Sequence, residues 1–150
     1  MLGAHMSRVA YVEGQYLPHR FAAVHVEDRG YRFADGVYDD EGHVTEGAST
    51  NSWIVTADGF VITRRADAAI LNGISRLAVL DIIRREGYRL VERSFTVAEA
   101  RSASEAFLTS TTAGLLPMVK IDGIPVGSGV PGPITLRLRE LYLAHSAAAA

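Results

Sequence analysis

The chain has 150 residues, of which 48% are hydrophobic and 21% are charged, and its formal net charge is −2 at pH 7. A chain of this length can bury roughly 70% of its unfolded surface, so we expect one globular unit with a substantial core. The small negative charge and the scattered arginines argue against a nucleic-acid partner, no apolar run approaches the roughly 20 residues of a membrane span, and cysteine is absent. We therefore expect a soluble, cytoplasmic protein without disulfides or thiolate metal sites.

The amino-terminal part of the chain predicts a short β segment. Residues 1–6, "MLGAHM", are typical of a cloning scar and are excluded from the fold prediction. In residues 7–38, apolar side chains alternate on both sides of Glu13 and Gly14, which predicts a hairpin, and "FAAVHVED" predicts a third strand. Residues 39–43, "DDEGH", then indicate a seam between two blocks.

The second block, residues 44–146, contains two Asp-Gly pairs, which are the strongest short hairpin signal. Asp58 and Gly59 separate strands that we expect near 52–56 and 60–63, and "MVKIDGIPV" predicts a second hairpin. Between the two hairpins, "EAFLTST" predicts another strand.

Two helices are predicted before the second hairpin. Residues 74–86 form the first, because apolar residues recur at helical spacing and Gly87 stands where a C-terminal cap belongs. Its apolar positions are Ile74, Leu77, Ala78 and Ile82. Thr96 and Glu99 form a capping box for a short helix that ends near Ser102.

Pro133 predicts the start of a last helix, which we expect to end near His145, before a frayed alanine tail at 147–150. Its leucines available for burial are Leu136, Leu138 and Leu141. The preceding glycines, Gly127, Gly129 and Gly132, satisfy the G-x-G-x-x-G pattern of a dinucleotide-binding turn. A second parallel strand and an acidic residue about 20 positions further on are both missing, so a plain glycine-rich loop is the better interpretation.

Three polar clusters carry the functional signal. "TEGASTNSW" places the carboxylate of Glu46 against a run of small hydrogen-bonding side chains. "LNGIS" places Gly73 and Ser75 at a helix start, where free amides and the helix dipole favour an anion; the alternative is that Asn72 or Ser75 simply caps the helix. "TSTT", at 109–112, ends a predicted strand. Together the clusters would suit a ligand with a phosphate at one end and a basic ring nitrogen at the other.

Several stretches of the chain together resemble one family. They are "YVEGQYLP", "VHVEDRGYRFADGVY", "GHVTEGASTNSWIV", "ILNGISR", "FTVAEA", "FLTSTTAGLLPMVKIDG" and "GPITLRLRELY". The sequence resembles the class IV aminotransferases, which are fold-type IV pyridoxal-phosphate enzymes, and is most similar to their D-amino-acid aminotransferase branch. The resemblance implies an α+β fold: the large domain of such an enzyme, a mixed sheet or pseudo-barrel with flanking helices, joined to an N-terminal hairpin from the small domain.

The resemblance also implies roles for individual residues. Glu46 matches the glutamate of the family's E-G-x-S-x-N motif, which pairs with the cofactor's pyridine nitrogen and keeps it protonated, so that the ring can accept electron density. Leu71 matches the residue that packs on the ring face, with a core residue as the alternative. The matches to the phosphate contacts are Ile74, Ser75, Ser110 and Thr111; Gly73 is added as a cofactor contact from its place at the same helix start. Tyr31 matches a residue near the substrate carboxylate, with a partly buried aromatic residue as the alternative.

The seam marks a departure from the family. In family members, most of the small domain, the connector and the first part of the large domain separate blocks that are almost adjacent here, at Tyr38 and His43. That segment carries the Schiff-base lysine and an arginine that contacts the phosphate. The single lysine of this chain, Lys120, alternates with Val119 and Ile121 and is expected to face solvent. The sequence therefore predicts no catalytic residue, and its histidines show no metal spacing.

The function that these observations predict is a class IV aminotransferase-like protein that holds pyridoxal phosphate non-covalently and transaminates weakly or not at all. An amino acid and a keto acid would be its substrates where activity persists. The alternatives are an engineered or degenerate folded scaffold without activity and a relative of the aminodeoxychorismate lyases. The missing segment is explained either by a natural deletion or by an engineered one, and the cloning scar favours a laboratory origin. Unpaired hairpin edges are expected to promote a homodimer or aggregation.

Overall fold

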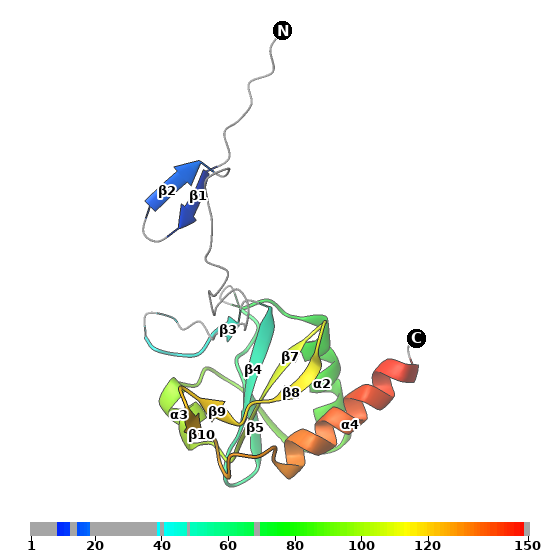
Figure 1. Cartoon of the computed structure of the whole chain (residues 1–150). Helices are drawn as coiled ribbons and strands as arrows, with labels where there is room; N and C mark the ends of the chain where they lie inside the picture. Colours follow the sequence, from blue (N-terminus) through cyan, green and yellow to red (C-terminus); the bar gives the residue numbers. More distant parts are fainter. Residues whose placement is uncertain are drawn as a thin grey trace.

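The computed structural model describes residues 9–12, 15–18, 39, 41–47, 49–67 and 70–148 (Figure 1). Its strands are β1 (Val9–Val12), β2 (Gln15–Pro18), β3 (Glu46–Gly47), β4 (Thr50–Val55), β5 (Phe60–Thr63), β6 (Arg89–Glu92), β7 (Glu105–Ser110), β8 (Gly114–Pro117), β9 (Lys120–Ile121) and β10 (Ile124–Pro125). Its helices are α2 (Ile74–Arg85), α3 (Val97–Ser102) and α4 (Pro133–Ala148).

A six-stranded mixed sheet organises the second block, in the order β6-β5-β4-β7-β8, with β3 pairing β4 off this path. Paired strands of this sheet run antiparallel except β5 and β6, which are parallel and are connected through α2. Two further antiparallel pairs, β1 with β2 and β9 with β10, lie outside it. The predicted α+β class with a mixed sheet is confirmed.

Strand β4 changes its neighbour along its length. Asn51 lies opposite Glu46 of β3, whereas Trp53 lies opposite Thr63 of β5. On the other edge of β4, Asn51 lies opposite Thr109 of β7. The first residues of β4 are therefore flanked by β3 and β7, and Glu46, Asn51 and Thr109 lie at one end of the sheet.

Two cores form on the two faces of the sheet, because successive strand residues point to opposite faces. The core shared with α2 and α4 contains Trp53, Val55, Val61, Val79, Leu80, Ile82, Ile83, Phe107, Leu115 and Leu138. The core shared with α3 contains Val44, Ile54, Ile62, Phe95, Ala100, Ala103, Ala106 and Val126. Figure 1 shows α2 and α4 on one side of the sheet and α3 on the other.

The local turn and cap signals are confirmed. Both Asp-Gly hairpins form, and Asp122 and Gly123 have φ values of 51° and 78°, as a two-residue hairpin turn requires. At the start of α3, the Glu99 N–H donates to Thr96 Oγ1 at 3.2 Å and the Thr96 N–H donates to Glu99 Oε2 at 3.0 Å. The β1–β2 hairpin is also present, whereas the strand expected at "FAAVHVED" lies outside the described residues.

Helix α2 ends as predicted, but two of its apolar positions stay exposed. Gly87 has a φ of 76°, and the Tyr88 N–H donates to the Ile83 carbonyl at 3.1 Å, which completes a Schellman end. Ile74 and Leu77, however, are 70% and 47% exposed. The buried residues are Ser75, Arg76, Val79, Leu80, Ile82 and Ile83. Of the four apolar positions named from the sequence, Ile82 is buried, whereas Ile74 and Leu77 are not, because the elements that α2 packs against, β6, β7 and α4, decide which side is covered.

Helix α4 runs three residues further than predicted, to Ala148. Alanine has the highest helix propensity, so the first two residues of the expected frayed tail, 147–150, continue the helix. Leu138 is fully buried and Leu141 packs against the core, as expected, but Leu136 is 48% exposed. Residues two positions apart lie about 200° apart around a helix, so Leu136 and Leu138 do not face the same core.

The glycine-rich loop before α4 serves packing. A Cβ on Gly132 would overlap the side chain of Glu105. The carboxylate of Glu105 accepts hydrogen bonds from the N–H groups of Ile134 and Thr135, at 3.1 and 2.7 Å. Because a protein carboxylate already occupies the amino end of α4, the plain-loop interpretation is supported over a dinucleotide-binding turn.

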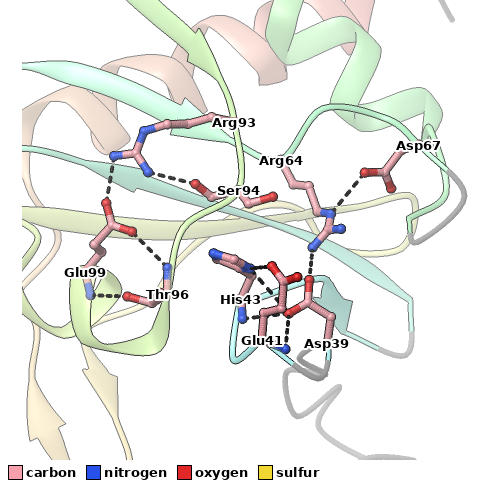
Figure 2. Close-up of polar contacts among 9 residues, drawn as sticks. All are labelled: Asp39, Glu41, His43, Arg64, Asp67, Arg93, Ser94, Thr96 and Glu99. Atoms are coloured by element: carbon pink, nitrogen blue, oxygen red, sulfur yellow. Dashed lines mark hydrogen bonds and ion pairs between the residues drawn. The ribbon is translucent and has the colours of Figure 1, made fainter.

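The predicted seam forms a compact turn in its described residues (Figure 2). The Asp39 N–H donates to the His43 carbonyl at 3.0 Å, and Asp39 Oδ1 accepts from the N–H groups of Glu41 and His43 at 3.2 and 2.9 Å. Arg64 donates to Asp39 Oδ2 at 2.8 Å, and this hydrogen bond is the main cause that lowers the pKa of Asp39 to about 2. The division of the chain into two domains at this seam stays a prediction.

Candidate functional site

A hollow of about 290 Å³ opens at the end of the sheet where β4 is flanked by β3 and β7. It is lined by Glu46, Gly47, Ser49, Thr50, Asn51, Leu71, Gly73, Ile74, Ser75, Thr109, Ser110 and Thr111. The seven residues predicted to contact a cofactor are all among them. The structure therefore brings the three polar clusters of the sequence together at one place.

Glu46 is held in a fixed orientation at this hollow. Its Oε2 accepts a hydrogen bond from the Leu71 N–H at 2.8 Å and a longer one from Asn51 Nδ2 at 3.3 Å. Asn51 Nδ2 also donates to the Leu71 carbonyl at 2.9 Å, and Asn51 is only 6% exposed. Among the described residues, no donor contacts Glu46 Oε1, so this oxygen can accept a hydrogen bond from a ligand.

Two apolar side chains stand at the hollow without being part of the core. Leu71 is 75% exposed and Ile74 is 70% exposed. The core alternative for Leu71 is therefore wrong. Apolar side chains that line a hollow next to a few oriented polar groups are typical of a ligand site.

The amino end of α2 lies at the hollow, and no described side chain caps it. Gly73 is the N-cap residue, and neither Asn72 nor Ser75 accepts a capping hydrogen bond, so the capping alternative is wrong. The first backbone bond of the helix runs from the Leu77 N–H to the Gly73 carbonyl at 3.0 Å. Helix geometry leaves the N–H groups before it without an intrahelical acceptor, and they are suited to bind an anion.

A chain of hydrogen bonds supports this end of α2 from behind. The Tyr142 hydroxyl on α4 donates to Ser75 Oγ at 3.0 Å, and the Ser75 hydroxyl donates to the Ser110 carbonyl at 2.9 Å. The Ala113 N–H donates to Ser110 Oγ at 3.1 Å. The hydroxyl groups of Ser75 and Ser110 thus have protein partners, whereas Thr111 is exposed at the rim.

Two more hydroxyl groups of the hollow lie in the predicted polar clusters but were not singled out as cofactor contacts from the sequence. Thr109 Oγ1 accepts a hydrogen bond from the indole of Trp53 at 3.0 Å. Thr50 Oγ1 is buried and has no hydrogen-bond partner among the described residues. A buried hydroxyl without a partner costs free energy, which a ligand that reaches it would recover. The neighbourhood of Thr109 also makes Trp53, the single tryptophan, a natural optical probe of the hollow.

The other predicted candidates lie elsewhere. Tyr31 falls outside the described residues. Lys120 is exposed on β9, as predicted, and does not line the hollow. Within the described ranges, no group of three or more His, Asp or Glu side chains is arranged to hold a metal ion. In the same part of the chain, no helix has the length and apolar character needed to cross a membrane.

Known proteins share this geometry and sequence. The family model described as amino-transferase class IV matches residues 5–121. The D-alanine aminotransferase of Listeria monocytogenes is 39% identical over 100 residues, which are 67% of this chain and 34% of that protein. The branched-chain-amino-acid aminotransferase of Pseudomonas aeruginosa is 39% identical over 104 residues, covering 69% of this chain and 33% of that protein.

Solved structures agree with the sequence matches. A branched-chain amino acid aminotransferase solved with pyridoxamine 5'-phosphate matches with a TM-score of 0.68 and 37% identity, over 72% of this chain and 35% of that one. The Escherichia coli branched-chain enzyme matches with a TM-score of 0.69 and 30% identity, over 73% and 37% of the two chains.

The mixed sheet thus has the fold of the fold-type IV aminotransferases. The chain belongs to the amino-transferase class IV family. It spans about one third of the length of the curated relatives it matches, since it covers 34% of the first of them.

Proposed function

We propose that this chain binds pyridoxal phosphate non-covalently in the hollow and has little or no transaminase activity. One observation carries the proposal: an oriented carboxylate, Glu46, and an uncapped helix end, at Gly73, line the same hollow. A protonated ring nitrogen needs the first group and a phosphate needs the second.

The remaining residues fit the same ligand. Leu71 offers an exposed apolar surface to one face of a ring, and the amides of Ile74 and Ser75 and the hydroxyl of Thr111 offer donors to a phosphate. Neither arginine nor lysine is among the described residues that line the hollow. Backbone amides and the helix dipole would therefore have to hold the phosphate, and the dipole contributes about 0.3–1 kcal/mol. We therefore expect modest affinity.

The chemistry divides between the cofactor and this chain. Pyridoxal phosphate, when bound, supplies an electron sink for the α carbon of an amino acid. Glu46 Oε1 would accept the ring N–H and hold the proton on the nitrogen, while Asn51 and the Leu71 amide keep the carboxylate in place.

We expect weak or absent transaminase activity because the single lysine of the chain does not line the hollow. Proton transfer at the α carbon needs an amine within reach of it. The single lysine, Lys120, is exposed on β9 and does not line the hollow. Where any turnover persists, the substrates would be an amino acid and a keto acid, as in the aminotransferases that this chain resembles.

The proposal is tested by titrating pyridoxal phosphate into the protein while following the visible absorption of the cofactor and the emission of Trp53. Glu46→Gln removes the charge that faces the ring nitrogen. Because a hydrogen bond to a charged group contributes about 1.5–3 kcal/mol, the variant is expected to bind roughly 10- to 150-fold more weakly. Glu140→Gln, an exposed carboxylate on α4, is the matched control and should bind like the unaltered protein.

Two further measurements separate the alternatives. A thermal unfolding midpoint that does not rise with the concentration of pyridoxal phosphate would favour a scaffold that binds nothing. Borohydride reduction followed by intact mass measurement tests the non-covalent part. A cofactor adduct on Lys120, together with amino-acid turnover that Lys120→Arg abolishes, would overturn the proposed inactivity.

A further inference from the structure

Arg76 is a buried cation that the cofactor contacts above leave unexplained. It is the third residue of α2 and only 1% exposed. Two physical arguments run against its position: a positive charge is disfavoured at the amino end of a helix, and desolvation of a buried guanidinium is costly. Its Nε, moreover, has no hydrogen-bond partner among the described residues. The position of Arg76 therefore calls for an explanation from its contacts.

The contacts of Arg76 join three separate places. Its NH1 donates to Asn72 Oδ1 at 2.8 Å. Its NH2 donates to the Arg64 carbonyl at 2.8 Å and to Glu92 Oε1 at 2.8 Å. Arg64 directly follows β5 and Asn72 directly precedes the N-cap of α2, so one guanidinium holds both ends of the segment between the sheet and the helix.

That segment carries the group that orients Glu46. Leu71, next to Asn72, donates its N–H to Glu46 Oε2 at 2.8 Å, and its carbonyl accepts from Asn51 at 2.9 Å. At the other end, the side chain of Arg64 is tied to Asp39 at 2.8 Å and to Asp67 at 3.4 Å (Figure 2). Because Asn72 directly follows Leu71 in the chain, a displacement of Asn72 would move the Leu71 amide away from the carboxylate.

We infer that Arg76 is a positioning residue: it clamps the segment from Arg64 to Asn72 so that the Leu71 amide fixes the carboxylate of Glu46 toward the ring nitrogen of the cofactor. This inference rests on the proposed function. Lysine cannot replace the arginine, because only a planar fork reaches an amide oxygen, a carbonyl and a carboxylate at once. Arg76 is not among the residues that line the hollow and acts only through Leu71.

The first arm of the test needs no ligand. Amide hydrogen exchange of Leu71 is measured by NMR in the unaltered protein and in Arg76→Lys. The matched control is Arg84→Lys, because Arg84 also pairs with Glu92, at 3.2 Å, but is exposed and does not reach the segment. Loss of one hydrogen bond corresponds to about a fivefold change, so Leu71 should exchange about fivefold faster in Arg76→Lys and at the original rate in Arg84→Lys.

The second arm measures the affinity for pyridoxal phosphate in a double-mutant cycle of Arg76→Lys with Glu46→Gln. If Arg76 acts through Glu46, Arg76→Lys weakens binding about fivefold in the original background and less than about twofold in the Glu46→Gln background. A merely structural role predicts equal losses in both backgrounds.

The outcomes separate the two proposals. Unchanged Leu71 exchange, or equal affinity losses in the two backgrounds, would overturn the positioning role. Failure of the unaltered protein to bind pyridoxal phosphate would overturn the proposed function, while the exchange arm still decides on the clamp. If Arg76→Lys does not fold, Asn72→Ala removes one arm of the clamp at an exposed position, and the same exchange and affinity changes are expected of it.

Discussion

Gly73→Ala is expected to damage the hollow by a steric clash of the added Cβ. Backbone strain is not the reason, because the backbone conformation at Gly73 does not require glycine. Its φ and ψ are −58° and 144°, which any residue adopts. The added Cβ, however, would lie 2.7 Å from Asn51 Oδ1. Asn51 would have to release its hydrogen bonds to the Leu71 carbonyl and to Glu46.

The magnitude follows from these two bonds. A neutral hydrogen bond contributes about 1 kcal/mol and one to a carboxylate about 1.5–3 kcal/mol, with the lower end apt for the 3.3 Å contact. Alanine returns about 0.4–1 kcal/mol by restricting the unfolded chain. The net loss of about 1.5–2.5 kcal/mol should lower the melting temperature by about 3–10 °C for a chain of this size. Binding of pyridoxal phosphate should weaken at least about fivefold, because Glu46 loses one of its two partners.

Gly87→Ala supplies the control, since it perturbs the protein for a different reason. No described atom lies within 4 Å of a Cβ at Gly87, but its φ of 76° strains any other residue, at roughly 1–2 kcal/mol. The two variants should therefore lose similar stability, yet only Gly73→Ala should lose affinity for pyridoxal phosphate. If Gly73→Ala melts at or above the original temperature and binds the cofactor unchanged, the steric reasoning is refuted.

Three further predictions concern stability. Asp39→Asn removes the ion pair with Arg64. Because the pKa of Asp39 falls from 3.8 to about 2 on folding, the pair stabilises the protein above about pH 4, and this stabilisation is lost as the pH falls toward 2. The melting temperatures of Asp39→Asn and the unaltered protein should therefore differ at neutral pH and converge near pH 2. Thr96→Ala breaks the capping box and should lower the free energy of unfolding, measured with urea, by about 1 kcal/mol. An unchanged free energy of unfolding would contradict a stabilising role for the capping box. Leu138→Ala should cost about 2–5 kcal/mol, whereas Leu136→Ala, at a half-exposed position of the same helix, should cost much less, and equal losses would contradict the assigned face.

Local chemistry explains what the sequence predicts well. The Asp-Gly turns, the Thr96–Glu99 capping box and Gly87 each depend on a few neighbouring residues, so their signals survive whatever the rest of the fold does. The buried face of α2 cannot be predicted from neighbouring residues alone. Ser75 is polar, yet it is buried because α4 and β7 pack against it. Ile74 and Leu77 are consequently exposed despite their hydrophobicity.

In the candidate site, too, the features that depend on tertiary contacts could not be predicted from neighbouring residues. The sequence allowed the three polar clusters to be linked to one ligand, but the individual roles of Glu46, Leu71 and Ser110 came only from the family resemblance, since their sequence spacing says nothing about a shared hollow. Arg76 was missed because two of its three partners, Arg64 and Glu92, are distant from it in the sequence. A signal did exist: an arginine in the first turn of a helix opposes the dipole, and such a residue requires a specific partner.

The register between β3 and β4 also bears on how this site tolerates change. Glu46 lies opposite Asn51 because two residues, 48 and 49, separate the paired strands in the sequence. Since strand side chains alternate with a period of two, inserting one residue there would turn Glu46 to the other face. Because Ser49 lines the hollow, a substitution there would alter the lining while Glu46 keeps its pairing with Asn51, whereas an insertion or deletion between the two strands would change that pairing even if the protein still folds.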